Sequence, residues 1–387
     1  MKILECDAKN LLQKQGIPIP RGEVVTSAEE AAIVAQAIGQ PVLLKAQIPS
    51  GGRMKAGGIH FADTPTEAQT IAAQLLGREL KGFTVTHLLI EAKLESAAEL
   101  FLGATYDSRT RQAVLLASKS GGINVEQSGD VLRVPFSVQN PFLDHNGREI
   151  AARLGFSGPS LAQLGGIIAQ IANLFLEWDA TLLEINPLIL SADGRWWVAD
   201  VHLELDDDAA YRQTNLLEKL PLSLEWANRR SDFEQQAAQI DQADHRGVAG
   251  RLVPFDGNLG LLIGGGGASL TIFDAVLDAG LKPANYCEIG GNPSVWKTKE
   301  LTKLILSQPQ VERIAVIMNV VSNTRVDLVA RGVIKGVLEL GLDPQQVIAA
   351  FRVPGSWEDE GQAILTHYGI PFFGRETSID QVVEAIK

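Results

Sequence analysis

The strongest constraint on the fold is a regular alternation of short apolar runs and helical patterns that begins near residue 250. Short buried strands that alternate with helices form parallel sheets covered on both faces. The sequence therefore predicts a flavodoxin-like, doubly wound α/β domain, in which each strand is followed by one helix. The five apolar runs are residues 258–267, 284–291, 313–321, 345–353 and 370–374.

The chain is too long for one domain of this kind. Its 387 residues exceed the roughly 250–300 residues beyond which a single hydrophobic core stops growing. Earlier in the chain, strand-like pairs at residues 99–118 and 181–205 are joined by short polar turns typical of hairpins. We therefore expect an α+β domain with a mixed or antiparallel sheet over residues 1–240, and the doubly wound domain over residues 241–387.

Charge and cysteine content argue against several functions. The net charge is −12, whereas nucleic-acid binders carry a basic surface that replaces counterions along the phosphate backbone. Cys6 and Cys287 lie outside any metal-binding spacing, which favours a reducing compartment. The sequence has no run of ~18 apolar residues and no cleavable leader pattern. We expect a cytoplasmic protein with no nucleic-acid and no membrane partner.

The stretch GGRMKAGG at residues 51–58 combines two glycine pairs with Arg53 and Lys55. Glycines let backbone amides approach a phosphate, and the two cations would neutralise it. A flexible surface turn would have the same composition. Lys45 favours the phosphate site, since it interrupts the apolar run PVLLKAQI and a buried lysine needs an anionic partner, which a ligand would supply. A lysine that reaches water from a strand edge is the alternative.

The second hairpin carries oxygen ligands that suit a metal ion. Asn186 and Asp200 lie on its two strands, and Mg²⁺ prefers carboxylate and amide oxygens beside nucleotide phosphates. Glu184 shares a strand face with Asn186 through the two-residue period of a strand. Glu91 and Glu99 flank a strand break and could receive an adenine amine or ribose hydroxyls; the alternative, which these residues alone favour, is that they are ordinary solvated carboxylates.

Two turns of the second domain could bind an anion. IGGGGASLT at residues 263–271 joins the first parallel strand to its helix, and such a turn presents free helix amides. It departs from GxGxxG, which argues against a dinucleotide. SNTRVD at residues 322–327 opens a later helix and is also explained as a Ser or Thr N-cap.

Together these segments resemble the nucleotide-binding β subunits of ADP-forming acyl-CoA synthetases, namely succinyl-CoA synthetase (succinate–CoA ligase) and the related N-terminal part of ATP-citrate lyase. GGRMKAGG is similar to the family's GGRGKAGG, EINPLIL to its EINPLVI, and VADVHLEL to its LDGKL strand. The resemblance covers essentially the whole chain, in order and spacing. It implies an ATP-grasp fold followed by a CoA-ligase domain. It also implies that the chain is one subunit of a hetero-oligomeric ligase that acts in the tricarboxylic acid cycle.

The resemblance also implies roles for single residues. In the family, ATP phosphorylates a histidine of the α subunit, the phosphate passes to a carboxylate, and CoA, bound mainly by that partner, forms the thioester. The histidines of this chain match no phosphohistidine loop, so an α subunit is needed. The implied nucleotide-binding residues are Lys45, Gly52, Arg53, Met54, Glu91 and Glu99. The implied ligands of Mg²⁺ are Asn186 and Asp200, and Glu184 would be the catalytic carboxylate that contacts the histidine.

The sequence departs from succinyl-CoA synthetases where the acid would bind. The expected substrate and phosphate site consists of Gly264, Ser322, Asn323, Thr324 and Arg352. Its polar side chains suit an oxygen-rich acid, and the segments GGGGAS and FFGRETSID resemble ATP-citrate lyase. Succinate is the first expectation among small di- and tricarboxylates, with citrate or malate as alternatives. Met54 in place of a family glycine also leaves room for a non-catalytic regulatory paralogue.

Overall fold

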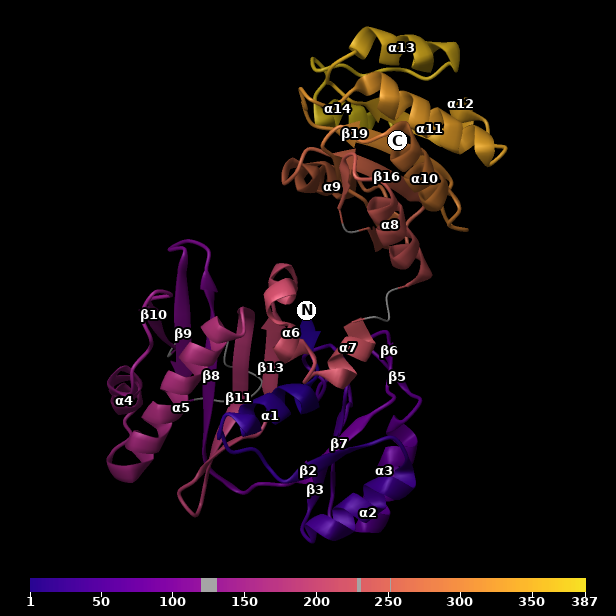
Figure 1. Ribbon diagram of the computed structural model, residues 1–387. Coiled ribbons are helices and arrows are strands. Elements are labelled where there is room, and N and C mark those ends of the chain that lie inside the picture. Colours follow the sequence, from indigo (N-terminus) through magenta and orange to yellow (C-terminus); the bar gives the residue numbers. More distant parts are fainter. Residues whose placement is uncertain (120–130, 228–230, 251) are drawn as a thin grey trace. The chain divides into compact units, whose positions relative to one another are not determined.

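In the computed structural model, the chain divides into two compact units, Met1–Arg229 and Arg230–Lys387. The structure describes residues 1–119, 131–227, 231–250 and 252–387 (Figure 1). Each unit has its own hydrophobic cores. The division lies ahead of residue 240, where we expected the boundary. Helix α8 (Asp232–Ala243) accounts for the difference, because it buries Phe233 and Ala237 in a core of the second unit.

The main sheet of the first unit is antiparallel. In the part of the chain that the structure describes, it has seven strands in the order β1-β13-β11-β8-β9-β10, with β12 paired to β11. Both predicted hairpins are confirmed, because β8 pairs with β9 and β11 pairs with β12. The strands are β1 (Lys2–Ile3), β8 (Ser96–Asp107), β9 (Gln112–Ser118), β10 (Leu132–Phe136), β11 (Ala180–Ser191), β12 (Trp196–Val198) and β13 (Val201–Leu205).

Helices α1 (Glu5–Lys14), α4 (Asp144–Arg153) and α5 (Gly158–Glu177) cover this sheet and share its core. Among the described residues, α5 is long and apolar enough to cross a membrane by length and composition. However, half of it is buried inside the unit, where Ile168 and Phe175 have no exposed surface. A core helix of a soluble protein passes the same test of length and composition.

A smaller antiparallel sheet of the first unit carries the segment PVLLKAQI. Its order is β2-β7-β3-β4, and helices α2 (Ala28–Ile38) and α3 (Pro65–Leu75) lie side by side against it (Figure 1). The sequence starts both helices with side-chain N-caps, since Ser27 and Thr64 accept backbone hydrogen bonds. The strands are β2 (Gly22–Val25), β3 (Val42–Ala46), β4 (Ile59–Ala62) and β7 (Leu88–Ala92), and the hairpin β5 (Glu79–Leu80) and β6 (Phe83–Thr84) follows α3.

Short helices complete the first unit. They follow β13, where the sequence becomes polar and helical as expected. Their bounds are η2 (Asp207–Arg212), α6 (Thr214–Leu217) and α7 (Pro221–Ala227).

The second unit is built on a parallel sheet. Among its described residues, β16 (Leu259–Gly264), β19 (Arg313–Met318) and β20 (Ile348–Arg352) form the ladder in the order β16-β19-β20. Two further predicted strands join its edges through single parallel bridges, Ile263 to Glu288 and Phe351 to Phe372.

Each of these two outer strands has a local reason for its short pairing. The segment 284–291 forms β17 (Asn285–Tyr286) and β18 (Ile289–Gly290), which pair instead with β15 (Val253–Pro254) and β14 (Val248–Ala249). The last strand contains Pro371, and proline has no amide hydrogen to donate to a ladder.

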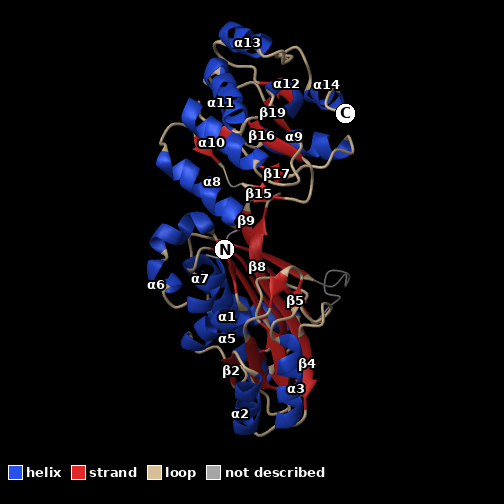
Figure 2. Cartoon of the chain, turned by 90° about the vertical axis from the view of Figure 1, so that its right-hand side faces the viewer, coloured by secondary structure: helices blue, strands red, loops and turns tan. Residues whose placement is uncertain are grey.

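Helices lie on both faces of this sheet, as Figure 2 shows. One face is covered by α8, α10 (Val295–Leu306), α11 (Val326–Glu339) and α13 (Glu358–His367), and the other by α9 (Ala268–Asp278) and α14 (Ile379–Glu384). A short helix, α12 (Pro344–Val347), precedes β20. The predicted α/β fold class, with a doubly wound second domain, is confirmed.

Candidate active site

A cavity of ≈ 1120 Å³ lies within the first unit and is lined by strands of both its sheets. It gathers segments that are far apart in the sequence, from the loop after β3 to the loop before β13. Every nucleotide, metal and catalytic candidate that the sequence placed in this unit lines it. These are Lys45, Gly52, Arg53, Met54, Glu91, Glu99, Glu184, Asn186 and Asp200.

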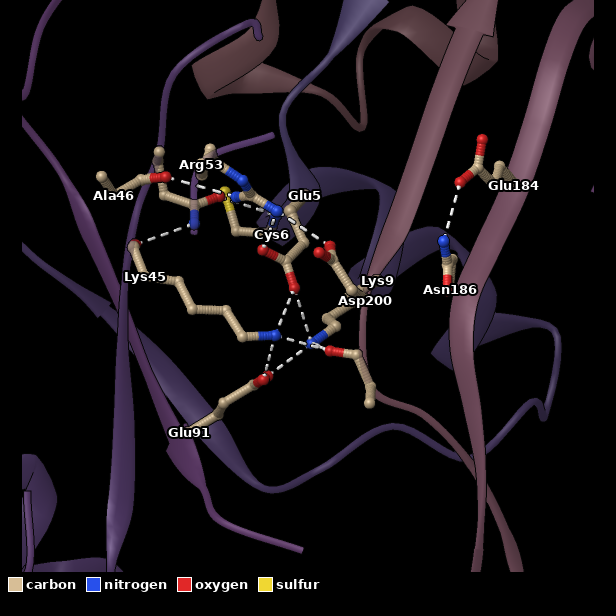
Figure 3. A network of polar contacts seen from close by, with 12 residues as sticks. Glu5, Cys6, Lys9, Lys45, Ala46, Arg53, Glu91, Glu184, Asn186 and Asp200 are labelled. Atoms are coloured by element: carbon tan, nitrogen blue, oxygen red, sulfur yellow. Dashed lines mark hydrogen bonds and ion pairs between the residues drawn. The ribbon is translucent and has the colours of Figure 1, made fainter. Parts of the chain in front are cut away.

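A dense group of charges, which we call the ion-pair cluster, lies at one wall of the cavity, and all its members except Lys9 line the cavity. It joins α1, β3, the glycine loop, β7 and the segment before β13, and Figure 3 shows the Glu5 carboxylate between the cations. Cations and carboxylates are equal in number, so the cluster is neutral. Its members are Glu5, Lys9, Lys45, Arg53, Glu91 and Asp200.

Protein oxygens satisfy the ammonium group of Lys45. The Nζ atom lies 2.9 Å from Glu5 and 2.5 Å from Glu91, and it donates to the Ala199 carbonyl oxygen at 2.6 Å. An ammonium group has three hydrogens to donate, and all are used here. The anionic partner that we expected a ligand to supply is therefore supplied by the chain itself.

Lys9 repeats this arrangement from helix α1. Its Nζ lies 2.9 Å from Glu5 and 2.5 Å from Glu91, and it donates to the Ala199 carbonyl at 2.7 Å. Glu91 is thus held between two lysines and is buried. We expected Glu91 at the adenine or ribose; in the structure it contacts these two lysines, and its place beside a nucleotide stays a prediction.

Arg53 anchors the glycine loop to the rest of the cluster. Its Nη1 donates to the Ala46 carbonyl at 3.2 Å, while Nη2 lies 2.7 Å from Glu5 and 2.8 Å from Asp200. The side chain is 8% exposed. Two carboxylates therefore share one edge of this guanidinium group.

Glu5, Lys45 and Arg53 hold one another in their charged forms. Burial raises the pKa of Glu5, but the attraction of Arg53, Lys45 and Lys9 outweighs it, so that the pKa lies well below its ordinary value. Burial lowers the pKa of Lys45, and the carboxylates of Glu5 and Glu91 more than reverse this shift. The pKa of Arg53 is raised in the same way.

Asp200 differs from Glu5 in the direction of its shift. Burial and repulsion from Glu5 raise its pKa, and the attraction of Arg53 and Lys45 offsets this in part. Of the two carboxylates that share Arg53, Asp200 is therefore the first to take up a proton as the pH falls.

The glycine loop turns tightly beside the cluster. Gly52 has φ +66°, a conformation that favours glycine, and the loop closes through the bond from the Gly58 amide to the Arg53 carbonyl at 2.8 Å. Lys81 of the β5–β6 turn donates to the Gly51 carbonyl at 2.6 Å. Met54 is 47% exposed on this loop, so its side chain does not fill the cluster.

The metal candidates meet where β11 approaches β13. The backbone amide of Asn186 donates to the backbone carbonyl oxygen of Asp200 at 3.1 Å. The side-chain Nδ2 of Asn186 donates to the Glu184 carboxylate at 3.4 Å. This bond confirms that Glu184 and Asn186 share a strand face. Glu99 lies farther along the cavity, exposed on β8, and accepts a hydrogen bond from Ser96 at 3.1 Å.

In the second unit, the candidates lie at the carboxyl ends of the parallel strands. Gly264 ends β16 in a space without room for a side chain, because a Cβ there would lie 2.5 Å from the Ile289 carbonyl oxygen. The next turn needs glycine too, since Gly265 and Gly266 have φ of +122° and +62°. This edge therefore offers backbone amides rather than side chains.

Ser322, Asn323 and Thr324 precede helix α11. They do not cap it, contrary to our expectation, because the helix begins at Val326 with Arg325 at the N-cap and no side-chain cap bond. Ser322 and Asn323 are exposed. Thr324 is buried, and its hydroxyl has no hydrogen-bond partner among the described residues.

Arg352 ends β20 at the same edge. It is buried, and it donates to the carbonyl oxygens of Met318 at 2.6 Å and Thr377 at 2.8 Å. Burial lowers its pKa, which Glu376 opposes. Two of its donors therefore hold the backbone around this edge.

Comparisons with known proteins agree with this geometry. Residues 2–190 match the family model of the ATP-grasp domain, and residues 229–386 match the model described as ATP citrate lyase citrate-binding. The succinate–CoA ligase [ADP-forming] subunit beta of Chloroflexus aurantiacus is 35% identical over 372 residues, which cover 94% of this chain and 93% of that protein. The subunit of the same name from Methanothermobacter thermautotrophicus is 34% identical over 390 residues, which cover 99% and 98%.

The chain belongs to the family of ADP-forming succinate–CoA ligase β subunits. It is therefore a subunit of an ATP-grasp ligase, a family that implies the use of ATP with a divalent metal ion. Among solved structures, ATP citrate lyase from Methanothrix soehngenii has a TM-score of 0.71 at 20% identity and covers 100% of this chain and 98% of its own. At this identity, the likeness shows a shared fold.

The residues present fit the divalent cation that a succinate–CoA ligase uses. The described residues contain no group of three or more His, Cys, Asp or Glu side chains that could hold a metal. One carboxylate and one amide beside an open cavity suit Mg²⁺, which keeps several waters and binds through substrate phosphates. Asp200 and Asn186 meet this description.

Sequence reasoning missed two members of the ion-pair cluster of this succinate–CoA ligase subunit. Glu5 and Lys9 are four residues apart on α1, a spacing that usually indicates a solvated surface pair. The available signal was their position among Leu4, Ala8 and Leu12, which are all buried. An ion pair on the apolar face of a helix must face another charge or a ligand.

Proposed function

We propose that the chain is the nucleotide-binding subunit of an Mg²⁺-dependent and ATP-dependent carboxylate–CoA ligase, and that ATP occupies the cavity of the first unit. One observation carries this proposal: the cavity brings the glycine loop, Lys45 and Arg53 together with Asn186 and Asp200. Phosphoryl transfer depends mainly on positioning and on neutralisation of charge. This wall provides both.

Each group has a role that follows from its position. The amides of the glycine loop, with Arg53 and Lys45, would hold the phosphates, and Glu99, which also lines the cavity, would accept ribose hydroxyls. Asn186 and Asp200 would hold Mg²⁺, which when bound neutralises phosphate oxygens and orients them for transfer. Met54 lies outside the cluster and leaves the phosphate contacts to its neighbours.

The acceptor in this proposal is a histidine of the α subunit. The terminal phosphoryl group of ATP passes to a histidine nitrogen and ADP leaves; the group then passes to a carboxylate oxygen of the acid, and the CoA thiol displaces phosphate to form the thioester. Glu184 on the cavity wall would orient this histidine by a hydrogen bond.

The buried, free thiols of Cys6 and Cys287 fit a reducing cytoplasm.

The acid would bind at the carboxyl edge of the sheet in the second unit, where succinate, citrate and malate are candidates. The names of the relatives favour succinate. The match of residues 229–386 to a citrate-binding family favours citrate. The unpartnered hydroxyl of Thr324 could donate to a carboxylate oxygen of any of these acids, and citrate and malate would offer it a hydroxyl group as well.

The test is ADP release by the complex with its α subunit, measured with CoA, Mg²⁺ and either succinate, malate or citrate. We expect turnover with one of these acids, and Asp200→Ala should abolish it together with Mg²⁺-dependent ATP binding. Undiminished ATP binding by Asp200→Ala would contradict the metal assignment. If ATP binds and the α-subunit histidine is phosphorylated, but no acid supports turnover, the chain is a regulatory paralogue and the ligase proposal fails.

A further inference from the structure

The two carboxylates that share Arg53 differ in how firmly they are held. The side chain of Glu5 is 1% exposed, whereas that of Asp200 is 31% exposed, and both line the cavity. Glu5 also contacts Lys9 and Lys45 at 2.9 Å each. Movement of Glu5 would leave three buried cations without this partner, whereas Asp200 can turn toward the cavity.

Charge balance indicates which contact must change when a nucleotide binds. With three cations and three carboxylates, the ion-pair cluster is already neutral. Phosphates that approach Arg53 meet a guanidinium group whose Nη2 edge is occupied by carboxylate oxygens at 2.7 and 2.8 Å. A phosphate can take this edge only if one carboxylate leaves it.

We propose that Arg53 has a fixed counter-ion and an exchangeable one: Glu5 is a positioning residue that holds Arg53 and Lys45 in place, and Asp200 releases Arg53 to the nucleotide phosphates. Asp200 is also the proposed metal ligand, so its move toward Mg²⁺ and the release of Arg53 are one event. This inference rests on the proposed function. It adds that metal and nucleotide bind with a mutual coupling that passes through the Arg53–Asp200 pair.

The experiment compares two isosteric changes on the same guanidinium group. The full chain with its α subunit is titrated calorimetrically with ADP, first with EDTA and then with Mg²⁺. In EDTA, Asp200→Asn should bind ADP at least about fivefold tighter than the wild type, because Arg53 is released. Glu5→Gln should bind ADP at least about fivefold more weakly, because the cations it holds repel one another. With Mg²⁺, Asp200→Asn should instead bind more weakly than the wild type.

The two changes should shift the ADP affinity in EDTA in opposite directions, and this distinguishes counter-ion exchange from simple repulsion between carboxylates and phosphates. Repulsion alone predicts that both changes tighten ADP binding in EDTA, and that result would overturn the proposal. An Arg53→Met background sharpens the comparison, since the gain from Asp200→Asn should disappear there. A gain of the same size without Arg53 would also contradict the exchange.

Glu5→Asp covers the case in which Glu5→Gln does not fold. It keeps the charge but shortens the side chain by one methylene, so it should weaken ADP binding about fivefold while the melting temperature shows a folded protein. Binding equal to that of the wild type would remove the positioning role. A wild-type complex that does not bind ADP even with Mg²⁺ would refute the proposed function itself, whereas normal Mg²⁺–ADP binding with shifts of equal sign would refute this inference alone.

Discussion

The candidate sites of the two units solve the problem of binding an anion in different ways. In the first unit, every cation of the ion-pair cluster faces a carboxylate within 2.9 Å before any ligand arrives. In the second unit, the edge of the parallel sheet offers glycine amides, the hydroxyl of Thr324 and an arginine, Arg352, whose donors hold carbonyl oxygens.

The difference suggests that the first unit is built to bind a highly charged ligand, and the second to discriminate among acids. Buried charges need partners at all times, so a site for a highly charged nucleotide carries its own counter-ions and must exchange them. At the edge of the parallel sheet, the donors of Arg352 face carbonyl oxygens rather than carboxylates, and the unpaired hydroxyl of Thr324 would contact the acid. We therefore expect phosphate to be neutralised in the first unit and the acid to be recognised through its oxygens in the second.

The largest expected effect is in the ion-pair cluster. Lys45→Met leaves Glu5 and Glu91 without one of their cations, which should lower the free energy of unfolding by about 3–5 kcal/mol and abolish nucleotide binding. Lys55→Met is the matched control, because Lys55 is exposed on the same loop, and it should change stability by less than about 0.5 kcal/mol. Urea unfolding of both variants measures the difference, and equal stabilities would show that the charges of the first unit are not interdependent.

The loss of stability caused by Glu5→Gln in the first unit should depend on pH. The pKa of Glu5 is lowered on folding from 4.5, so its ionised form stabilises the folded state above that pH, and the contribution is lost as the pH falls through the lower folded value. The destabilisation by Glu5→Gln should therefore be constant above about pH 5.5 and shrink below it. Unfolding midpoints over this range measure it; a deficit that grows toward low pH has the wrong sign for this account.

A smaller effect is expected at Thr324. Thr324→Val removes a buried hydroxyl that has no partner, so it should leave the free energy of unfolding unchanged or raise it by about 1 kcal/mol while it weakens binding of the acid. Thr298→Val is the control, because its hydroxyl is also buried and unpartnered but the residue packs against Gly332 of α11. Thermal unfolding and acid titration should show similar stabilities, with affinity lost in Thr324→Val alone. Equal acid affinities would remove Thr324 from the site.

The smallest effect concerns the thiols. Burial raises the pKa of both Cys6 and Cys287 to about 12, so neither should react with iodoacetamide at neutral pH in the folded protein, and both should react in urea. Mass spectrometry of the alkylated chain measures this. Rapid labelling of native Cys6 would show that the first unit opens next to Glu5.

The fold was predictable where the sequence pattern is local. The alternation of strands and helices identified the doubly wound unit, and PVLLKAQI and the two hairpins identified strands of the first. The outer strands of the second unit were predicted too long, because pairing with β14 and β15 and the missing amide hydrogen of Pro371 depend on partners that periodicity does not reveal.

The site was predictable only in part for the same reason. Lys45 was noticeable because a charge interrupts an apolar strand. Glu5 and Lys9 look like an ordinary helical pair until α1 packs beside the cavity. The pairing of Glu91 with Lys9 was not foreseen either, because Lys9 is 82 residues away in the sequence. Contacts between distant segments are set by tertiary packing, which a single sequence does not show.

The assignment of one ligand to each unit is tested most directly by hydrogen–deuterium exchange of the complex with its α subunit. Exchange is measured with Mg²⁺–ADP and, separately, with the acid that supports turnover. The account predicts that Mg²⁺–ADP slows exchange in residues 45–58 and 184–202, and that the acid slows it in residues 264–267 and 322–326. Protection of residues 45–58 by the acid, or of residues 322–326 by the nucleotide alone, would contradict the assignment of one ligand to each unit.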